Sequence, residues 1–207
     1  MASATAIPSR RTRDAAGVAE VYIGGAADAQ SRIVTSYVAA RQGALSREGG
    51  RRSAAWFSYS NFRGVMAHCV DAAARGDALV LVGHSWGSDT ALKVAHRMPC
   101  PVALLAGIDP VARNGRVLTR VSRRPQSAKT VVHVDARPRR LDRSDVVKAM
   151  GVVMGLGLAP AFRRADLKIV TPFNHWAFAD MMAAQDATDR SVARMIDDLR
   201  TPANRVG

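Results

Sequence analysis

Cysteine, lysine and long apolar runs are all scarce in this 207-residue sequence. Its two cysteines, Cys69 and Cys100, are too few for a disulfide framework, and nothing in the sequence requires an oxidising compartment. The longest apolar run, residues 149–161, contains three glycines and falls short of the roughly 20 apolar residues that span a bilayer. Residues 1–14 lack the apolar segment of an export signal. We therefore expect a chain that is cytoplasmic, or exported without a cleaved signal peptide.

Arginine, in contrast, is abundant. The sequence has 30 basic and 17 acidic residues, a formal net charge of +13, and 26 of the basic residues are arginines. With 48% hydrophobic and 23% charged residues, the composition is that of an ordinary globular chain. The length favours one domain over residues 18–207, preceded by a flexible tail of residues 1–17.

Short apolar runs alternate with segments of helical spacing along the chain. The runs predict six strands, at residues 19–23, 54–59, 78–82, 102–106, 130–134 and 166–170. The helical spacing predicts helices over 31–41, 65–73, 90–97, 144–156 and most of 176–198. The sequence therefore predicts an α/β fold, with a mostly parallel sheet of about six strands and helices on both faces.

A G-x-S-x-G motif, Gly83-His84-Ser85-Trp86-Gly87, lies directly between a predicted buried strand and a helix that begins near Ser88. This strand–turn–helix context predicts a nucleophile elbow with Ser85 as the nucleophile. The helix N-terminus beside Ser85 carries free N–H groups that favour a developing oxyanion. His84 is expected to be a packed or orienting residue.

A serine nucleophile needs a base, and the base needs an acid that orients it. His175 follows the last predicted strand and is the predicted base, whereas His133 lies inside an apolar strand and is expected in the core. Asp109 and Asp135 follow the two strands after the elbow, and either gives the order Ser, Asp, His. We favour Asp109 as the acid, with Asp135 as its main rival and Asp142 third.

A glycine-rich loop at residues 24–28 follows the first predicted strand, which should neighbour the elbow strand. Its glycines would let a backbone N–H approach a substrate closely. The expected oxyanion hole pairs the N–H of Trp86 with that of Gly25 or Ala26. The alternative is a plain glycine turn capped by Asp28.

Two groups of arginines follow consecutive strands on the face of the predicted site. The first group, expected to attract an anionic substrate or surface, is Arg113, Arg116, Arg120, Arg123 and Arg124. The second group is Arg137, Arg139, Arg140 and Arg143. The alternative is a solvated rim on an arginine-biased chain. No helix-turn-helix, zinc spacing or aromatic platform accompanies this charge, so no specific nucleic acid is expected.

Three segments carry a resemblance to the α/β-hydrolase superfamily, and within it to small bacterial lipases and esterases: residues 83–87, residues 107–111 (Gly-Ile-Asp-Pro-Val) and residues 174–178 (Asn-His-Trp-Ala-Phe). The second resembles the Gly-Leu-Asp-Pro that carries the acid in several lipases, which also favours Asp109. Residues 23–28 further resemble small bacterial lipase-like proteins, some of them linked to type VI secretion. The resemblance implies a minimal α/β-hydrolase fold without a cap domain.

These patterns together predict a serine carboxylic-ester hydrolase, a lipase or esterase with phospholipids among its candidate substrates, that acts through an acyl-enzyme. Its expected partners are an ester or lipid substrate and an anionic membrane surface, with no metal and no organic cofactor. Two alternatives stay open: an acyltransferase or thioesterase with the same triad, and a non-catalytic basic module that binds anionic lipid or nucleic acid. The sequence does not predict protein partners.

Overall fold

The chain forms a six-stranded sheet in which every neighbouring pair of strands is parallel. This computed structural model describes residues 17–26, 28–111, 124–138, 162 and 164–199. The strand order is β2-β1-β3-β4-β5-β6. The strands are β1 (Val18–Gly24), β2 (Arg52–Ser58), β3 (Ala78–His84), β4 (Val102–Ile108), β5 (Ala128–Ala136) and β6 (Leu167–Thr171). The predicted α/β class and the predicted parallel sheet are confirmed.

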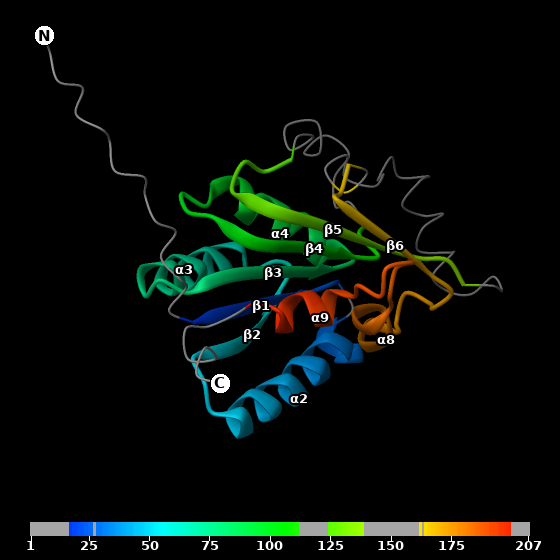
Figure 1. The fold of residues 1–207 in the computed structure, drawn as a ribbon, viewed down its shortest axis with the longest axis horizontal. Coiled ribbons are helices and arrows are strands. Elements are labelled where there is room, and N and C mark those ends of the chain that lie inside the picture. The colour runs from blue at the N-terminus through cyan, green and yellow to red at the C-terminus, as the bar shows by residue number, and fades with distance from the viewer. Residues whose placement is uncertain (1–16, 27, 112–123, 139–161, 163, 200–207) are drawn as a thin grey trace, which may run out of the picture.

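Helices cover both faces of the sheet (Figure 1). One face carries α3 (Phe62–Ala74) and α4 (Trp86–Arg97), and the other carries α2 (Ile33–Glu48), α8 (Phe178–Ala183) and α9 (Val192–Asp197). A one-turn helix, α1 (Asp28–Ser31), precedes α2. In the part of the chain that the structure describes, no helix combines the length and apolar character needed to cross a membrane. The predicted helix at 144–156 lies outside the described residues.

Strand β3 shows why the central strands are continuously apolar. Leu79 and Leu81 pack with the α3/α4 layer, while Val80 and Val82 pack with the α2/α8/α9 layer. All four are fully buried, because successive side chains of a strand point to opposite faces and both faces are covered. The last residue of the strand, His84, therefore lies on the α8 face, where its ring contacts Phe178.

The strand order reverses between β1 and β3. These two strands are hydrogen-bonded neighbours, yet β2 lies beyond β1 and β4 lies beyond β3. The connections that leave their carboxyl ends consequently diverge to opposite faces of the sheet. In open α/β sheets, such a switch point is where ligands bind. The G-x-S-x-G motif lies at this position, directly after β3.

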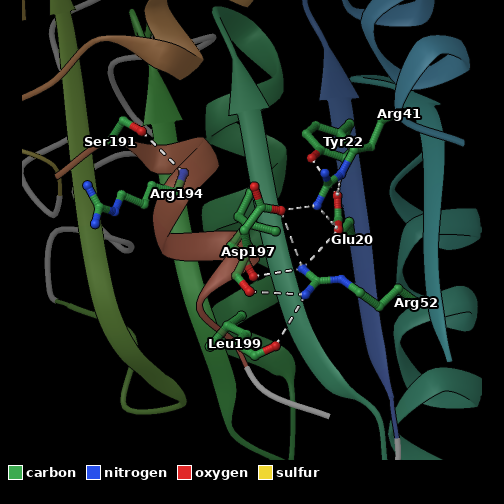
Figure 2. Close-up of polar contacts among 9 residues, drawn as sticks. Glu20, Tyr22, Arg41, Arg52, Ser191, Arg194, Asp197 and Leu199 are labelled. Atoms are coloured by element: carbon green, nitrogen blue, oxygen red, sulfur yellow. Dashed lines mark hydrogen bonds and ion pairs between the residues drawn. The ribbon is translucent and has the colours of Figure 1, made fainter. Parts of the chain in front are cut away.

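A buried ionic cluster ties the C-terminal helix to the sheet (Figure 2). Glu20 on β1 is fully buried, and its two carboxylate oxygens accept from Arg41 at 2.9 and 3.0 Å. Arg41 also pairs with Asp197 of α9. Arg52 on β2 reaches Glu20 at 3.4 Å and donates to the Ile196 carbonyl at 2.7 Å, near the helix C-terminus. The cluster thus joins β1, α2, β2 and α9, and places cations where the helix dipole favours them.

Residues 176–198, predicted to be mostly helical, are helical over about half of their length. This segment forms two six-residue helices, α8 and α9, separated by a loop. Within the loop, the Asp186 carboxylate accepts from the backbone N–H groups of Thr188 and Arg190, at 2.9 Å each. A short acidic side chain that bonds nearby backbone donors favours a turn over a helix.

Candidate active site

Ser85 lies in a strained turn between β3 and α4. Its φ of 52° and ψ of −124° are rarely adopted by residues with a side chain. The backbone is held on both sides of the turn: Ser85 N donates to the Ile108 carbonyl at 3.1 Å, and the Ser85 carbonyl accepts from Val111 N at 3.3 Å. The Ser85 side chain makes no capping hydrogen bond to its own helix. The hydroxyl is therefore not used in holding the turn.

Two glycines of the motif allow the backbone to pass this closely. A Cβ on Gly87 would lie 2.0 Å from the Ile23 carbonyl oxygen, and one on Gly83 would lie 2.4 Å from the Ser88 Cα. Both distances are far below van der Waals contact, and both neighbours are backbone atoms. The spacing of glycines on either side of Ser85 is thus a steric requirement of this turn.

His175 is joined to Asp109 by a short, buried hydrogen bond. The His175 Nδ1 lies 2.6 Å from the Asp109 Oδ2, and the two side chains are only 4% and 3% exposed. Asp109 follows β4 with a φ of 41°, and its N–H donates to the Val134 carbonyl at 2.7 Å. Its second oxygen, Oδ1, accepts from Ala136 N at 3.3 Å. The carboxylate is therefore fixed by β5 before it meets the imidazole.

Asp135, the rival acid, lies elsewhere. Strand β5 continues to Ala136, so Asp135 is inside the strand and not after it. Its neighbours Val134 and Ala136 pack on the α8 face, so its own side chain points to the opposite face. There it pairs with Arg137 at 2.9 Å and Lys168 at 3.5 Å. The third rival, Asp142, lies outside the described residues.

His84 contacts His175 directly. The His84 Nε2 lies 2.8 Å from the His175 carbonyl oxygen, and the two ring centroids are 4.6 Å apart. His84 is buried, and burial, with the neighbouring His175, lowers its pKa to about 3. His84 is therefore neutral at physiological pH. The expectation of a packed or orienting residue agrees with these contacts, although the sequence did not indicate which group it contacts.

The loop after β1 approaches Ser85 closely. A Cβ on Gly25 would lie 2.8 Å from the Ser85 Cβ and 3.3 Å from its Oγ, so only glycine leaves room at this point. Gly25 is buried, and Ala26 beside it is exposed. Trp86 is the first residue of α4, where backbone N–H groups have no acceptor within the helix. The predicted donors Trp86 and Gly25 thus flank the Ser85 side chain.

The sequence did not predict the contacts of two residues near Ser85, Asp28 and Tyr59. Asp28, which the sequence indicated only as a cap, is buried and accepts from Val34 N at 2.7 Å and from Trp56 Nε1 at 2.6 Å. It therefore anchors the glycine loop to α2 and β2. Tyr59 packs edge-on against Trp86, with ring centroids 5.4 Å apart. Neither contact has a local sequence pattern, because each joins residues more than five positions apart.

The position expected for Arg124 at the mouth of the site is wrong. Its guanidinium pairs with Asp166 and donates to the carbonyls of Ala128 and Lys129 at 3.1 and 2.6 Å. These partners lie at the amino ends of β5 and β6, whereas Ser85 follows the carboxyl end of β3. A connection that enters a parallel strand must return to its amino end, so its last residues leave the site. Seven of the nine expected arginines lie outside the described residues: Arg113, Arg116, Arg120 and Arg123 of the first group, and Arg139, Arg140 and Arg143 of the second.

Comparison with known proteins leaves the site to be interpreted from its geometry. The chain matches no protein-family model and no curated protein sequence. Across the described ranges, no group of three or more His, Cys, Asp or Glu side chains could hold a metal ion. What the described site contains is a serine on a strained turn, an imidazole, a buried carboxylate and backbone donors.

Proposed function

We propose that this chain is a serine hydrolase of carboxylic esters, with Ser85, His175 and Asp109 as its catalytic triad. The observation that carries the proposal is the buried 2.6 Å bond between His175 Nδ1 and Asp109 Oδ2, together with a serine held at φ 52° whose backbone bonds to Ile108 and Val111, on either side of Asp109. A structural role for Ser85 alone would not require strain of about 1–3 kcal/mol in its backbone. Strain of this kind is typical of sites at which a side chain must project toward a reacting atom.

The geometry supports one assignment of protons. Asp109 accepts from Nδ1, so Nε2 is the ring nitrogen that takes the proton of the Ser85 hydroxyl. The Ser85 oxygen then attacks the ester carbonyl, and the negative charge on the carbonyl oxygen is stabilised by the N–H groups of Trp86 and of Gly25 or Ala26. His175 next protonates the leaving alcohol, and a C–O bond to that alcohol breaks.

Water completes the reaction by the same route. His175 takes a proton from water, the hydroxide oxygen bonds to the acyl carbon, and the bond to Ser85 breaks with return of the proton to its oxygen. The buried Asp109 carboxylate stabilises the imidazolium that forms in each half of the cycle. No redox step and no external proton donor is needed.

The class of ester is a further part of the proposal. A phospholipid preference was expected from the arginines after β4 and β5. Arg124 does not support it, because this residue faces the opposite edge of the sheet. Arg137 follows β5 on the side of the site and is 64% exposed, although it already pairs with Asp135. We therefore propose a carboxylic ester as the substrate, and treat preference for an anionic lipid as a separate outcome of the test.

Labelling with a fluorophosphonate probe tests this function. We expect covalent modification of Ser85, mapped by mass spectrometry, and hydrolysis of short p-nitrophenyl esters, both lost in Ser85→Ala. A panel that adds phospholipid vesicles and competing alcohols then distinguishes a lipase, a soluble esterase and an acyltransferase. A parent protein that neither reacts with the probe nor hydrolyses any ester would contradict the proposal, as would Ser85→Ala with parental activity.

A further inference from the structure

The loop that carries His175 is joined to the sheet by few polar contacts. Among the described residues, two long-range hydrogen bonds reach residues 172–177: Asp109 to the His175 ring, and His84 to the His175 main chain. The other hydrogen bonds of this segment are local, such as Ala177 N to the Asn174 carbonyl at 3.1 Å. The ring and the backbone of His175 are thus held separately, each by one side chain.

The direction of the His84 bond determines the form of its ring. A carbonyl oxygen only accepts, so the His84 Nε2 carries the hydrogen that it donates at 2.8 Å. The other ring nitrogen, Nδ1, is buried and has no hydrogen-bond partner among the described residues. A proton there would create a buried charge without an acceptor. His84 is therefore the neutral Nε2–H tautomer, which agrees with the lowering of its pKa to about 3.

A neutral neighbour suits the chemistry proposed for His175. The two rings lie with centroids 4.6 Å apart, and His175 becomes positively charged when it takes the Ser85 proton. A second charge on His84 at this distance would oppose that step. Among the described residues, the charged group that faces the pair is Asp109, which has the opposite sign and favours the protonation of His175.

We infer that His84 is a positioning residue, whose Nε2–H fixes the main chain of His175 relative to the nucleophile that follows His84 directly in the chain. This inference rests on the proposed function. Ser85 is held at φ 52° and ψ −124°, so its backbone cannot turn freely relative to His84. One end of β3 therefore sets both the nucleophile and the base, and His84 acts on the reaction through His175 without touching the substrate.

A pair of amide substitutions tests this role. In His84→Gln the side-chain nitrogen lies three bonds from Cβ, as the His84 Nε2 does, and reaches the carbonyl. In His84→Asn it lies two bonds from Cβ and falls short. Because misplacement of a catalytic group by about 1 Å costs on the order of 100-fold, we expect His84→Asn to lower kcat about 10- to 100-fold. We expect KM to stay within about twofold, and His84→Gln to keep kcat within about threefold of the parent.

Matched controls separate positioning from loss of a buried histidine. His133 is equally buried but lies on the opposite face of the sheet, beside Phe162. We expect His133→Gln and His133→Asn to have the same kcat as each other. All rates are divided by the fraction of protein that a fluorophosphonate labels, so that unfolded molecules do not count. Equal kcat in His84→Gln and His84→Asn, whether high or low, would overturn the inference.

A second measurement uses the parent protein alone, so it does not require that any variant folds. Ring-nitrogen NMR of the parent should find His84 as the neutral Nε2–H tautomer from pH 5 to pH 9. An Nδ1–H tautomer, or a titration of His84 within that range, would overturn the inference. A parent that fails to react with fluorophosphonate rejects the proposed function, whereas a reactive parent with equal variants rejects only the role of His84.

Discussion

Removal of the Asp109 charge is expected to have a large effect on catalysis and a small one on folding. In Asp109→Asn, the Asn oxygen can still accept from Ala136 N, as the Asp109 Oδ1 does at 3.3 Å. What is lost is the anion 2.6 Å from the His175 Nδ1. If the amide nitrogen faces the ring instead, two donors oppose each other and the imidazole loses its orientation.

The size of the loss follows from the distance. Once His175 holds the Ser85 proton, the ring and the carboxylate are opposite unit charges about 2.6 Å apart. At an effective dielectric constant of about 20, their attraction is about 6 kcal/mol. Since each 1.36 kcal/mol is a factor of ten in rate, we expect turnover to fall roughly 10⁴-fold.

Asp135→Asn is the matched control, because it makes the same substitution on the neighbouring strand. Asp135 pairs with the half-exposed Arg137 and Lys168, an interaction worth up to about 1 kcal/mol. We expect its turnover to stay within a few-fold of the parent. The assay is steady-state hydrolysis of a short p-nitrophenyl ester, with thermal unfolding followed for each variant. Asp109→Asn within tenfold of the parent, or a larger loss in Asp135→Asn, would refute the assignment of the acid.

Three further predictions concern the glycine loop after β1, the buried His84 and the ionic cluster around Glu20. Gly25→Ala places a Cβ 2.8 Å from the Cβ of the proposed nucleophile, so esterase activity should fall at least tenfold. Gly43→Ala in α2, whose new Cβ meets no atom closer than 3.5 Å, should instead raise unfolding free energy by about 0.5–1 kcal/mol at parental activity. Burial lowers the pKa of His84 from 6.5 to about 3, so the unfolded chain binds a proton that the native state excludes, and stability falls as pH drops below about 6.5. The native protein should lose about 3 kcal/mol of unfolding free energy from this group between pH 7 and pH 4.5. Urea unfolding at the two pH values should show a loss smaller by that amount in His84→Gln than in the parent; an equal loss in both proteins would contradict the prediction. Glu20→Gln should lower the unfolding free energy by about 3–5 kcal/mol, because it leaves the half-buried guanidinium groups of Arg41 and Arg52 with only the exposed Asp197 as an anion. Arg75→Gln, in the exposed 3.1 Å pair with Asp77, should cost under about 1 kcal/mol; similar losses in the two variants would refute a stabilising role of the Glu20 cluster.

The sequence alone determined the strands and the turn that carries Ser85. Each of the six strands is a short apolar run, and each depends on residues adjacent in the chain, so periodicity is sufficient to find it. The turn at residues 83–87 is equally local, since its glycines are required by backbone contacts within and beside the motif. The choice of His175 as the candidate base followed from the rule that ligand sites of open α/β sheets lie past the carboxyl ends of the parallel strands.

The tertiary structure decided which side chains meet. Asp109 and Asp135 both lie near the carboxyl ends of strands, and only the extension of β5 to Ala136 turned Asp135 to the other face. Arg124 pairs with Asp166 at the amino ends of β5 and β6, away from Ser85, and residues 176–198 form two helices separated by the Asp186 turn. The bond from His84 to the His175 carbonyl spans 91 positions. Such contacts depend on strand order and on the path of the loops, which no local pattern of residues encodes.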